Sequence, residues 1–263
     1  MRAFLSPWTR RPLAMITGAA LSAGLGLRAQ ADPTVFNFAS SSEGWTAAVE
    51  SGSSVNPFTW SGTAGVGGGG AWYTAGVGST SIKTLTSPVM TVAGAGPIDV
   101  VIQHRYNFER GFEIGNPDAW DGGNLRYRVN GGTWTTVAND AFAAGGYNNA
   151  VTDNGVDGLP IDLNANPPTF DPGWWWASTG YSTPQYITSA ATFGNFSAGD
   201  TVQIALRGGW DLDSATASPN WVIGSIQVDG VVPEPGATAL ATGLALAAFG
   251  WARRHVARHS NRA

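Results

Sequence analysis

Apolar and aromatic side chains recur at every second position in several stretches of the middle of the chain. In the stretch 100–108, the side chains that share one face of an extended strand are Val100, Ile102, His104, Tyr106 and Phe108. The same alternation occurs at 125–129 and at 202–207. A two-residue period is that of a β-strand with one buried face, and no part of 32–232 keeps the 3.6-residue period of an amphipathic helix. The central segment is therefore predicted to be all-β.

The remaining strands are separated by turn residues. Further strands are predicted at Val35–Phe38, Ile82–Val92, Thr133–Val137 and Trp221–Val231. Asn130-Gly131-Gly132 has the composition of a hairpin turn, and Ser87-Pro88 predicts a break near a strand end. Short strands joined by turns predict an antiparallel β-sandwich, with the Gly- and Asn-rich stretch 139–173 as a long loop.

The C-terminal end places an apolar segment between a proline-rich turn and basic residues. Pro233-Glu234-Pro235 comes first, 17 uncharged residues follow at 236–252, and Arg253-Arg254 comes next. This length lies at the lower end of the roughly 17–25 residues that span a bilayer. Basic residues after the segment favour the cytoplasmic side for that end. We therefore predict a transmembrane helix at 236–252, with a terminal core helix of a soluble domain as the alternative.

In this order, the Pro-Glu-Pro turn, the apolar helix and the basic tail resemble a bacterial PEP-CTERM sorting signal, which would occupy 232–263. The resemblance implies transient anchoring in the inner membrane and processing by an exosortase-type enzyme. It also implies delivery to the cell surface or the extracellular matrix of a cell that makes extracellular polysaccharide.

The N-terminal end fits export as well. Basic residues up to Arg11 precede an apolar stretch at Leu13–Leu27, and Ala29-Gln30-Ala31 has the small-residue pattern of a cleavage site. We predict a signal peptide at 1–31, a β-sandwich domain at 32–231 and the sorting signal at 232–263.

Trimming both ends makes the remaining protein acidic. Residues 32–232 hold six Lys and Arg against 17 Asp and Glu, a net charge of −11, whereas the full chain has −4. Nucleic acid is excluded as a partner, because affinity for phosphate needs a basic surface. The chain has no cysteine, so the exported domain must be held by a core or by bound metal.

Several segments together resemble the MAM-like jelly-roll domain of secreted proteins. In chain order they are Glu43-Gly44-Trp45, Leu85-Thr86-Ser87-Pro88, His104–Glu109, Trp120-Asp121-Gly122-Gly123, Arg126–Trp134 and Asp211–Trp221. The resemblance implies a structural Ca²⁺ bound by Glu109, Asp121 and Asp213, and oxygen ligands from separate loops suit this ion. The alternative is that these carboxylates are solvated, with Glu109 paired to Arg105 or Arg110.

Three consecutive tryptophans, Trp174, Trp175 and Trp176, are the most unusual internal feature. Adjacent residues of a strand face opposite ways, so at least one of these rings is expected to meet solvent or a loop. With Tyr181 they are candidates to stack on sugar rings. The alternative is that some of the three fill the core.

No catalytic constellation is found. His104 is the single histidine of 32–232, and its alternation with apolar residues favours a buried, hydrogen-bonded position. The sequence has neither a Gly-x-Ser-x-Gly elbow nor His-Glu-x-x-His spacing. We predict a non-catalytic surface or matrix protein that binds polysaccharide or surface partners. A structural matrix protein without a ligand and a glycan-active hydrolase are the alternatives.

Overall fold

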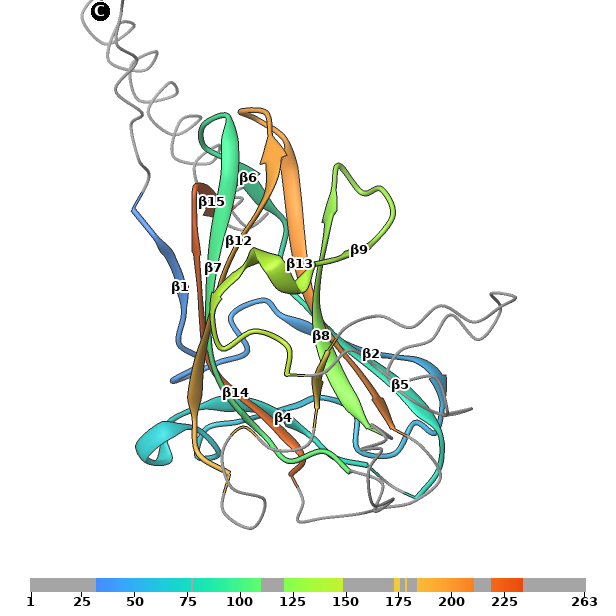
Figure 1. Cartoon of the computed structure of the whole chain (residues 1–263). Helices are drawn as coiled ribbons and strands as arrows, with labels where there is room; N and C mark the ends of the chain where they lie inside the picture. The colour runs from blue at the N-terminus through green and yellow to red at the C-terminus, as the bar shows by residue number, and fades with distance from the viewer. Residues whose placement is uncertain are drawn as a thin grey trace, which may run out of the picture.

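A computed structural model describes residues 32–76, 78–109, 121–148, 173–175, 178, 184–210 and 219–233. These residues form two antiparallel sheets that lie face to face as a sandwich (Figure 1). The predicted all-β sandwich is therefore confirmed. The predicted signal peptide at 1–31 and helix at 236–252 lie outside the described residues. Within the described ranges, no helix is long and apolar enough to cross a membrane.

One sheet has seven strands in the described part of the chain. In spatial order they are β10 (Phe142–Ala144), β12 (Ile187–Phe196), β7 (Gly96–Tyr106), β14 (Trp221–Asp229), β4 (Ala71–Thr74) and β3 (Thr59–Ser61), with β1 (Thr34–Phe36) also pairing with β14. The central strands β7, β12 and β14 make the longest pairings of this sheet.

The second sheet has eight strands in the same described part. Its main path is β11 (Trp174–Trp175), β8 (Gly122–Val129), β13 (Thr201–Trp210), β5 (Ser81–Thr86) and β2 (Thr46–Gly52). Three short strands complete it: β6 (Met90–Val92), β9 (Thr135–Thr136) and β15 (Val231–Pro233). Two 3₁₀ turns, η1 (Val66–Gly68) and η2 (Asn139–Ala141), lie in the connections.

The predicted turns occur where the sequence placed them. The break at Ser87-Pro88 separates β5 from β6, and both strands pair with β13. Asn130 and Gly131 take positive φ angles of 51° and 69°, and the turn connects β8 to β9 as a hairpin.

Two predictions about the strands were wrong. The final strand is not continuous from Trp221 to Val231, because Gly230 takes a φ of 83° and turns the chain from β14 in one sheet to β15 in the other. The predicted loop 139–173 contains η2 and β10, and its residues 149–172 lie outside the described part of the chain.

Tryptophans dominate the core at one end of the sandwich. Trp174, Trp210 and Trp221 are each at most 1% exposed. Two glycines make room for these rings: a Cβ on Gly123 would lie 2.4 Å from the ring of Trp221, and a Cβ on Gly208 would lie 2.4 Å from the ring of Trp210. The rings of Trp210 and Trp221 therefore pack against the eight-stranded sheet at these two glycines, which have no side chains.

Candidate binding face

The side of the eight-stranded sheet that faces away from the core carries polar and charged residues. Leu125 and Tyr127 of β8 pack in the core, so strand alternation turns Asn124, Arg126 and Arg128 to the other side. The sequence therefore lines up one amide and two guanidinium groups along one strand.

The neighbouring strands extend this arrangement. In the antiparallel register, Arg207 of β13 lies opposite both Asn124 of β8 and Thr84 of β5, and Gln203 lies opposite Arg128. We call the outward-facing residues of β8, β13 and β5 the outer face. Three of its side chains are arginines, and none of its positions holds a carboxylate.

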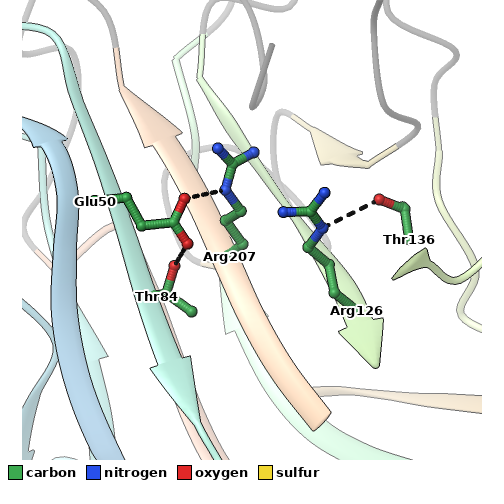
Figure 2. Close-up of polar contacts among 5 residues, drawn as sticks. All are labelled: Glu50, Thr84, Arg126, Thr136 and Arg207. Carbon is green, nitrogen blue, oxygen red and sulfur yellow. Dashed lines mark hydrogen bonds and ion pairs between the residues drawn. The ribbon is translucent and has the colours of Figure 1, made fainter. Parts of the chain in front are cut away.

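An ion pair crosses the outer face from the edge strand β2. Glu50 lies on β2, and one of its carboxylate oxygens accepts a hydrogen bond from Arg207 Nε at 2.7 Å, while the other accepts one from Thr84 Oγ1 (Figure 2). The side chain of Arg207 is 9% exposed and that of Glu50 is 34% exposed. Because the guanidinium is largely removed from water, the carboxylate both offsets its charge and fixes its direction.

A second guanidinium approaches from β8. Arg126 Nε donates to Thr136 Oγ1 of β9 at 3.3 Å. Figure 2 shows the guanidinium groups of Arg126 and Arg207 on the same side of the sheet, on the neighbouring strands β8 and β13. Their backbones are diagonal neighbours in the register, since Arg126 lies opposite Ala205.

The third arginine is held between an amide and an aromatic ring. Arg128 donates to Gln203 Oε1 from Nε at 3.0 Å and from Nη2 at 2.5 Å. Its guanidinium carbon lies 4.7 Å from the ring centre of the partly exposed Trp134. Arg128 and Gln203 also line an open pocket of about 210 Å³ with Val89. This end of the outer face therefore combines a cation, a partly exposed aromatic ring and a pocket.

Asn124 contributes an unusual buried amide. Its side chain is 0% exposed, and in the described part of the chain neither its oxygen nor its nitrogen has a hydrogen-bond partner. A buried polar group without a partner costs about 1–3 kcal/mol. Such a group is rare in folded proteins and is therefore informative about a site.

Only some of the aromatic residues predicted to bind sugar lie among the described residues. Trp174 is 0% exposed, with its Nε1 donating to Gly145 O at 2.9 Å and its ring 4.5 Å from that of His104. Trp174 therefore fills the core, which was the alternative interpretation. The backbone of Trp175 pairs with Gly122 at the edge of the sheet. Trp176 and Tyr181 lie outside the described residues.

Only two of the three predicted calcium ligands lie among the described residues. Asp121 is 1% exposed, Glu109 is partly buried, and Asp213 lies outside the described residues. Among the residues that are described, no three His, Asp or Glu side chains gather as a metal site. Lys83 is close enough for Asp121 to raise its pKa, while the dominant effect of burial lowers the pKa of Lys83 to about 8.

His104 occupies the buried position that its alternation predicted, and this prediction is confirmed. Trp221 Nε1 donates to His104 Nδ1 at 3.1 Å, so the proton of the neutral ring is on Nε2, which faces Ser189 Oγ at 2.8 Å. Ser189 Oγ donates in turn to Gly145 O. Burial lowers the pKa of His104 to about 3. This ring cannot take a proton from Ser189, because the nitrogen facing the serine already carries one.

Comparison with known proteins gives no family. No family model and no curated protein matches the chain. Among solved structures, the chain is similar to the C-terminal CBM6 of LamC, a laminarinase from Zobellia galactanivorans, with 12% identity, a TM-score of 0.32, and coverage of 75% of this chain and 98% of that one.

Two further solved structures are similar to a comparable degree. One is a cleaved adhesin domain of Lys-gingipain from Porphyromonas gingivalis, with 13% identity, a TM-score of 0.32, and coverage of 78% and 100%. The other is the enzymatically active domain of tailspike protein 4 of bacteriophage CBA120, with 11% identity, a TM-score of 0.31, and coverage of 72% and 19%. Likenesses of this size assign no function to the chain.

Proposed function

We propose that the chain is a non-catalytic, exported surface or matrix protein that binds polysaccharide through the outer face. The observation that carries this proposal is the alignment of Arg126, Arg128 and Arg207 on one side of a sheet with amide and hydroxyl side chains between them. Extended rows of such donors suit the hydroxyl and acidic groups of a sugar chain.

The shape of the outer face supports an extended ligand. Alternate residues of an antiparallel strand are about 7 Å apart, so the partly exposed Arg126 and Arg128 are separated by roughly 7 Å along β8. Trp134 offers a partly exposed ring at one end of this row. Aromatic rings present an apolar surface on which the apolar side of a sugar packs, and the donors beside the ring then fix its orientation.

The absence of catalysis is part of the same proposal. His104 is enclosed by Trp174, Trp221 and Ser189 in the core and is neutral at every pH near 7. A general base has to reach the reacting atoms, and this ring does not meet solvent.

Binding to immobilised polysaccharides tests the proposal directly. The full-length chain, purified in a mild detergent, is expected to bind the extracellular polysaccharide of its own producer. Replacement of Trp134 by Ala is expected to weaken this binding by about tenfold, because a ring contact of this kind contributes on the order of 1–2 kcal/mol. Replacement of Trp60, which lies in β3 of the other sheet, serves as the matched control. Absence of binding to that polysaccharide would contradict the proposal.

We also propose that residues 232–263 are a sorting signal. Val231–Pro233 forms β15 and pairs with β6, so the Pro-Glu-Pro motif begins at the last residue of this strand. Glu234, Pro235, Arg253 and Arg254 lie outside the described residues. Mass spectrometry of the exported protein is expected to find a C-terminus near Pro233, and an intact Ala263 would contradict processing by an exosortase-type enzyme.

A further inference from the structure

Arg128 is held along one edge and over one face, and the far end of its guanidinium is unused. Nε and Nη2 both donate to Gln203 Oε1, at 3.0 and 2.5 Å, and the guanidinium carbon lies 4.7 Å from the ring centre of Trp134. Arginine has five N–H donors, so two on Nη1 and one on Nη2 have no acceptor among the described residues. Two of these three are parallel, one on each Nη atom, and form a fork that matches two oxygens of one anion.

The open pocket of about 210 Å³ gives a ligand room beside this partly exposed arginine. Three separate segments line it: Val89 between β5 and β6, Gly131 in the turn between β8 and β9, and Thr201–Gln203 in β13. A Cβ added to Gly131 would meet nothing within 4 Å, which shows independently that the space beside this turn is open. A water takes up about 30 Å³ in the liquid, so the pocket is large enough for a substituent of a sugar ring.

The residues that line the pocket carry one charge, that of Arg128. No described carboxylate forms an ion pair with it. Asp200 directly precedes Thr201 of the lining, and its two oxygens accept hydrogen bonds from Asn130 Nδ2 at 2.9 Å and from Ser197 N at 2.8 Å. An arginine that is partly removed from water and has no counter-ion gains more from an anion than from a neutral hydroxyl group.

We propose that the polysaccharide is acidic, and that an oxyanion carried by one of its sugars, a carboxylate or a sulfate ester, binds in this pocket on the free end of Arg128. This proposal rests on the proposed function. Gln203 is a positioning residue, because it fixes the direction of the guanidinium. Trp134 covers one face of the guanidinium, so the anion approaches in the plane of the N–H groups. A guanidinium already fixed in this way loses little conformational entropy when the anion binds.

Chemical removal of the anions from the ligand tests the proposal. The probe is the extracellular polysaccharide of the producer, immobilised in three forms: untreated, after reduction of its carboxyl groups to alcohols, and after solvolytic removal of its sulfate esters. We expect the full-length chain to bind one of the two treated forms at least tenfold more weakly than the untreated polymer, and that treatment identifies the anion. Binding to the untreated polymer should also weaken as salt increases, because charges are screened.

Arg128→Gln removes the fork, and Arg105→Gln is its matched control. Both arginines are partly exposed, each lies over an aromatic ring, that of Trp134 or that of Tyr186, and each substitution removes one positive charge. Arg105 lies on β7 of the other sheet. We expect Arg128→Gln to bind the untreated polymer at least tenfold more weakly and the anion-free polymer as the native protein does. Arg105→Gln should bind both forms normally, and melting curves establish that each variant is folded.

A second pair of variants tests the position of the anion. Gly131→Asp and Gly131→Asn add side chains of nearly the same size at the pocket, and Asn and Asp are among the residues that best accept the φ of 69° found there. The two variants differ in charge, so effects of size and folding cancel when they are compared. The carboxylate of the Asp variant competes with the ligand for Arg128, and we expect this variant to bind at least tenfold more weakly than the Asn variant.

The outcomes separate this proposal from the one on which it rests. Equal binding of the untreated polymer and both treated forms would overturn the anion site while leaving polysaccharide binding in place. Equal losses of affinity in Arg128→Gln and Arg105→Gln, or equal affinities of the two Gly131 variants, would overturn it as well. Failure to bind any form of the polysaccharide would overturn both proposals.

Discussion

The ammonium group of Lys83 lies 4.5 Å from the ring centre of Trp210, inside the sandwich. It donates a hydrogen bond of 2.6 Å to the carbonyl of Ala75, and the residue is 0% exposed. The only lysine of the chain is therefore a core residue. Lysine is rarely buried in this way, and here a carbonyl, an aromatic ring and the nearby carboxylate of Asp121 compensate its charge.

We predict that stability rises with pH between about 8 and 10. Burial lowers the pKa of Lys83 to about 8, so in this window the unfolded chain binds a proton that the folded chain does not. The free energy of unfolding should then increase by up to about 1.4 kcal/mol per pH unit. The chain has no cysteine and no second lysine to obscure this slope. Urea unfolding at each pH measures it.

Lys83→Met is the control for that prediction. Methionine keeps the length of the side chain and cannot titrate, so its slope between pH 8 and 10 should be flat. Parallel curves for the native protein and the variant would contradict a buried Lys83. Above pH 10 both should lose stability, because burial raises the pKa of Tyr106 above that of a tyrosine in the unfolded chain.

A second prediction concerns acid. His104 has a folded pKa of about 3, whereas an unfolded histidine has one near 6.5, so the unfolded chain binds an extra proton between these values. Stability should therefore fall as the pH drops below about 6.5, with one proton contributing about 1.4 kcal/mol per pH unit. Carboxylates also titrate here, so the measurement is the difference between the native protein and a variant.

His104→Gln is the suitable variant for this comparison. The glutamine amide can accept from Trp221 and donate to Ser189 as the ring does, but it does not titrate. The variant should lose stability with acid less steeply than the native protein. Two curves of equal slope between pH 4 and 6.5 would show that His104 is not the buried neutral ring described above.

A third prediction concerns the glycines under the tryptophans. Gly208→Ala places a Cβ 2.4 Å from the ring of Trp210 and should cost about 1–3 kcal/mol, as overpacking does. Gly94→Ala is the matched control, since a Cβ there meets nothing within 4 Å, and its effect should stay within about 1 kcal/mol. Chemical denaturation of both variants measures the difference, and equal stabilities would mean that the Trp210 ring is placed differently.

The sequence predicts a strand of this fold where large apolar residues alternate with polar ones, and misses a strand where they do not. The strands at β7, β8 and β13 were predicted because large apolar residues such as Ile102, Leu125 and Ile204 alternate with polar ones. β12 was missed, since its buried positions include Ser189, which is polar, and Ala191, which is too small to mark an apolar face. The bend at Gly230 was missed because a glycine inside an apolar run does not reveal its φ angle.

The candidate site was predicted less well than the fold. The alternating basic residues Arg126 and Arg128 indicated that one side of β8 is polar, but their partners come from distant parts of the chain. Glu50 and Arg207 are separated by 157 residues, and only the register of β2, β5 and β13 brings them together. Trp174 was a candidate ligand-binding residue because the sequence does not show that its indole packs against His104 and Trp221 in the core.

The calcium site at Glu109, Asp121 and Asp213 stays a prediction, and the melting temperature with and without Ca²⁺ tests it. Ca²⁺ should raise the melting temperature, since a concentration one hundred times the Kd adds about 2.7 kcal/mol to stability, and EDTA should reverse the effect. Asp121→Asn should remove the response. The ammonium of Lys83 repels a cation near Asp121, so the affinity for Ca²⁺ should also increase when the pH rises above about 8. A melting temperature that EDTA leaves unchanged at both pH 7 and pH 9 would mean that these carboxylates hold no stabilising ion.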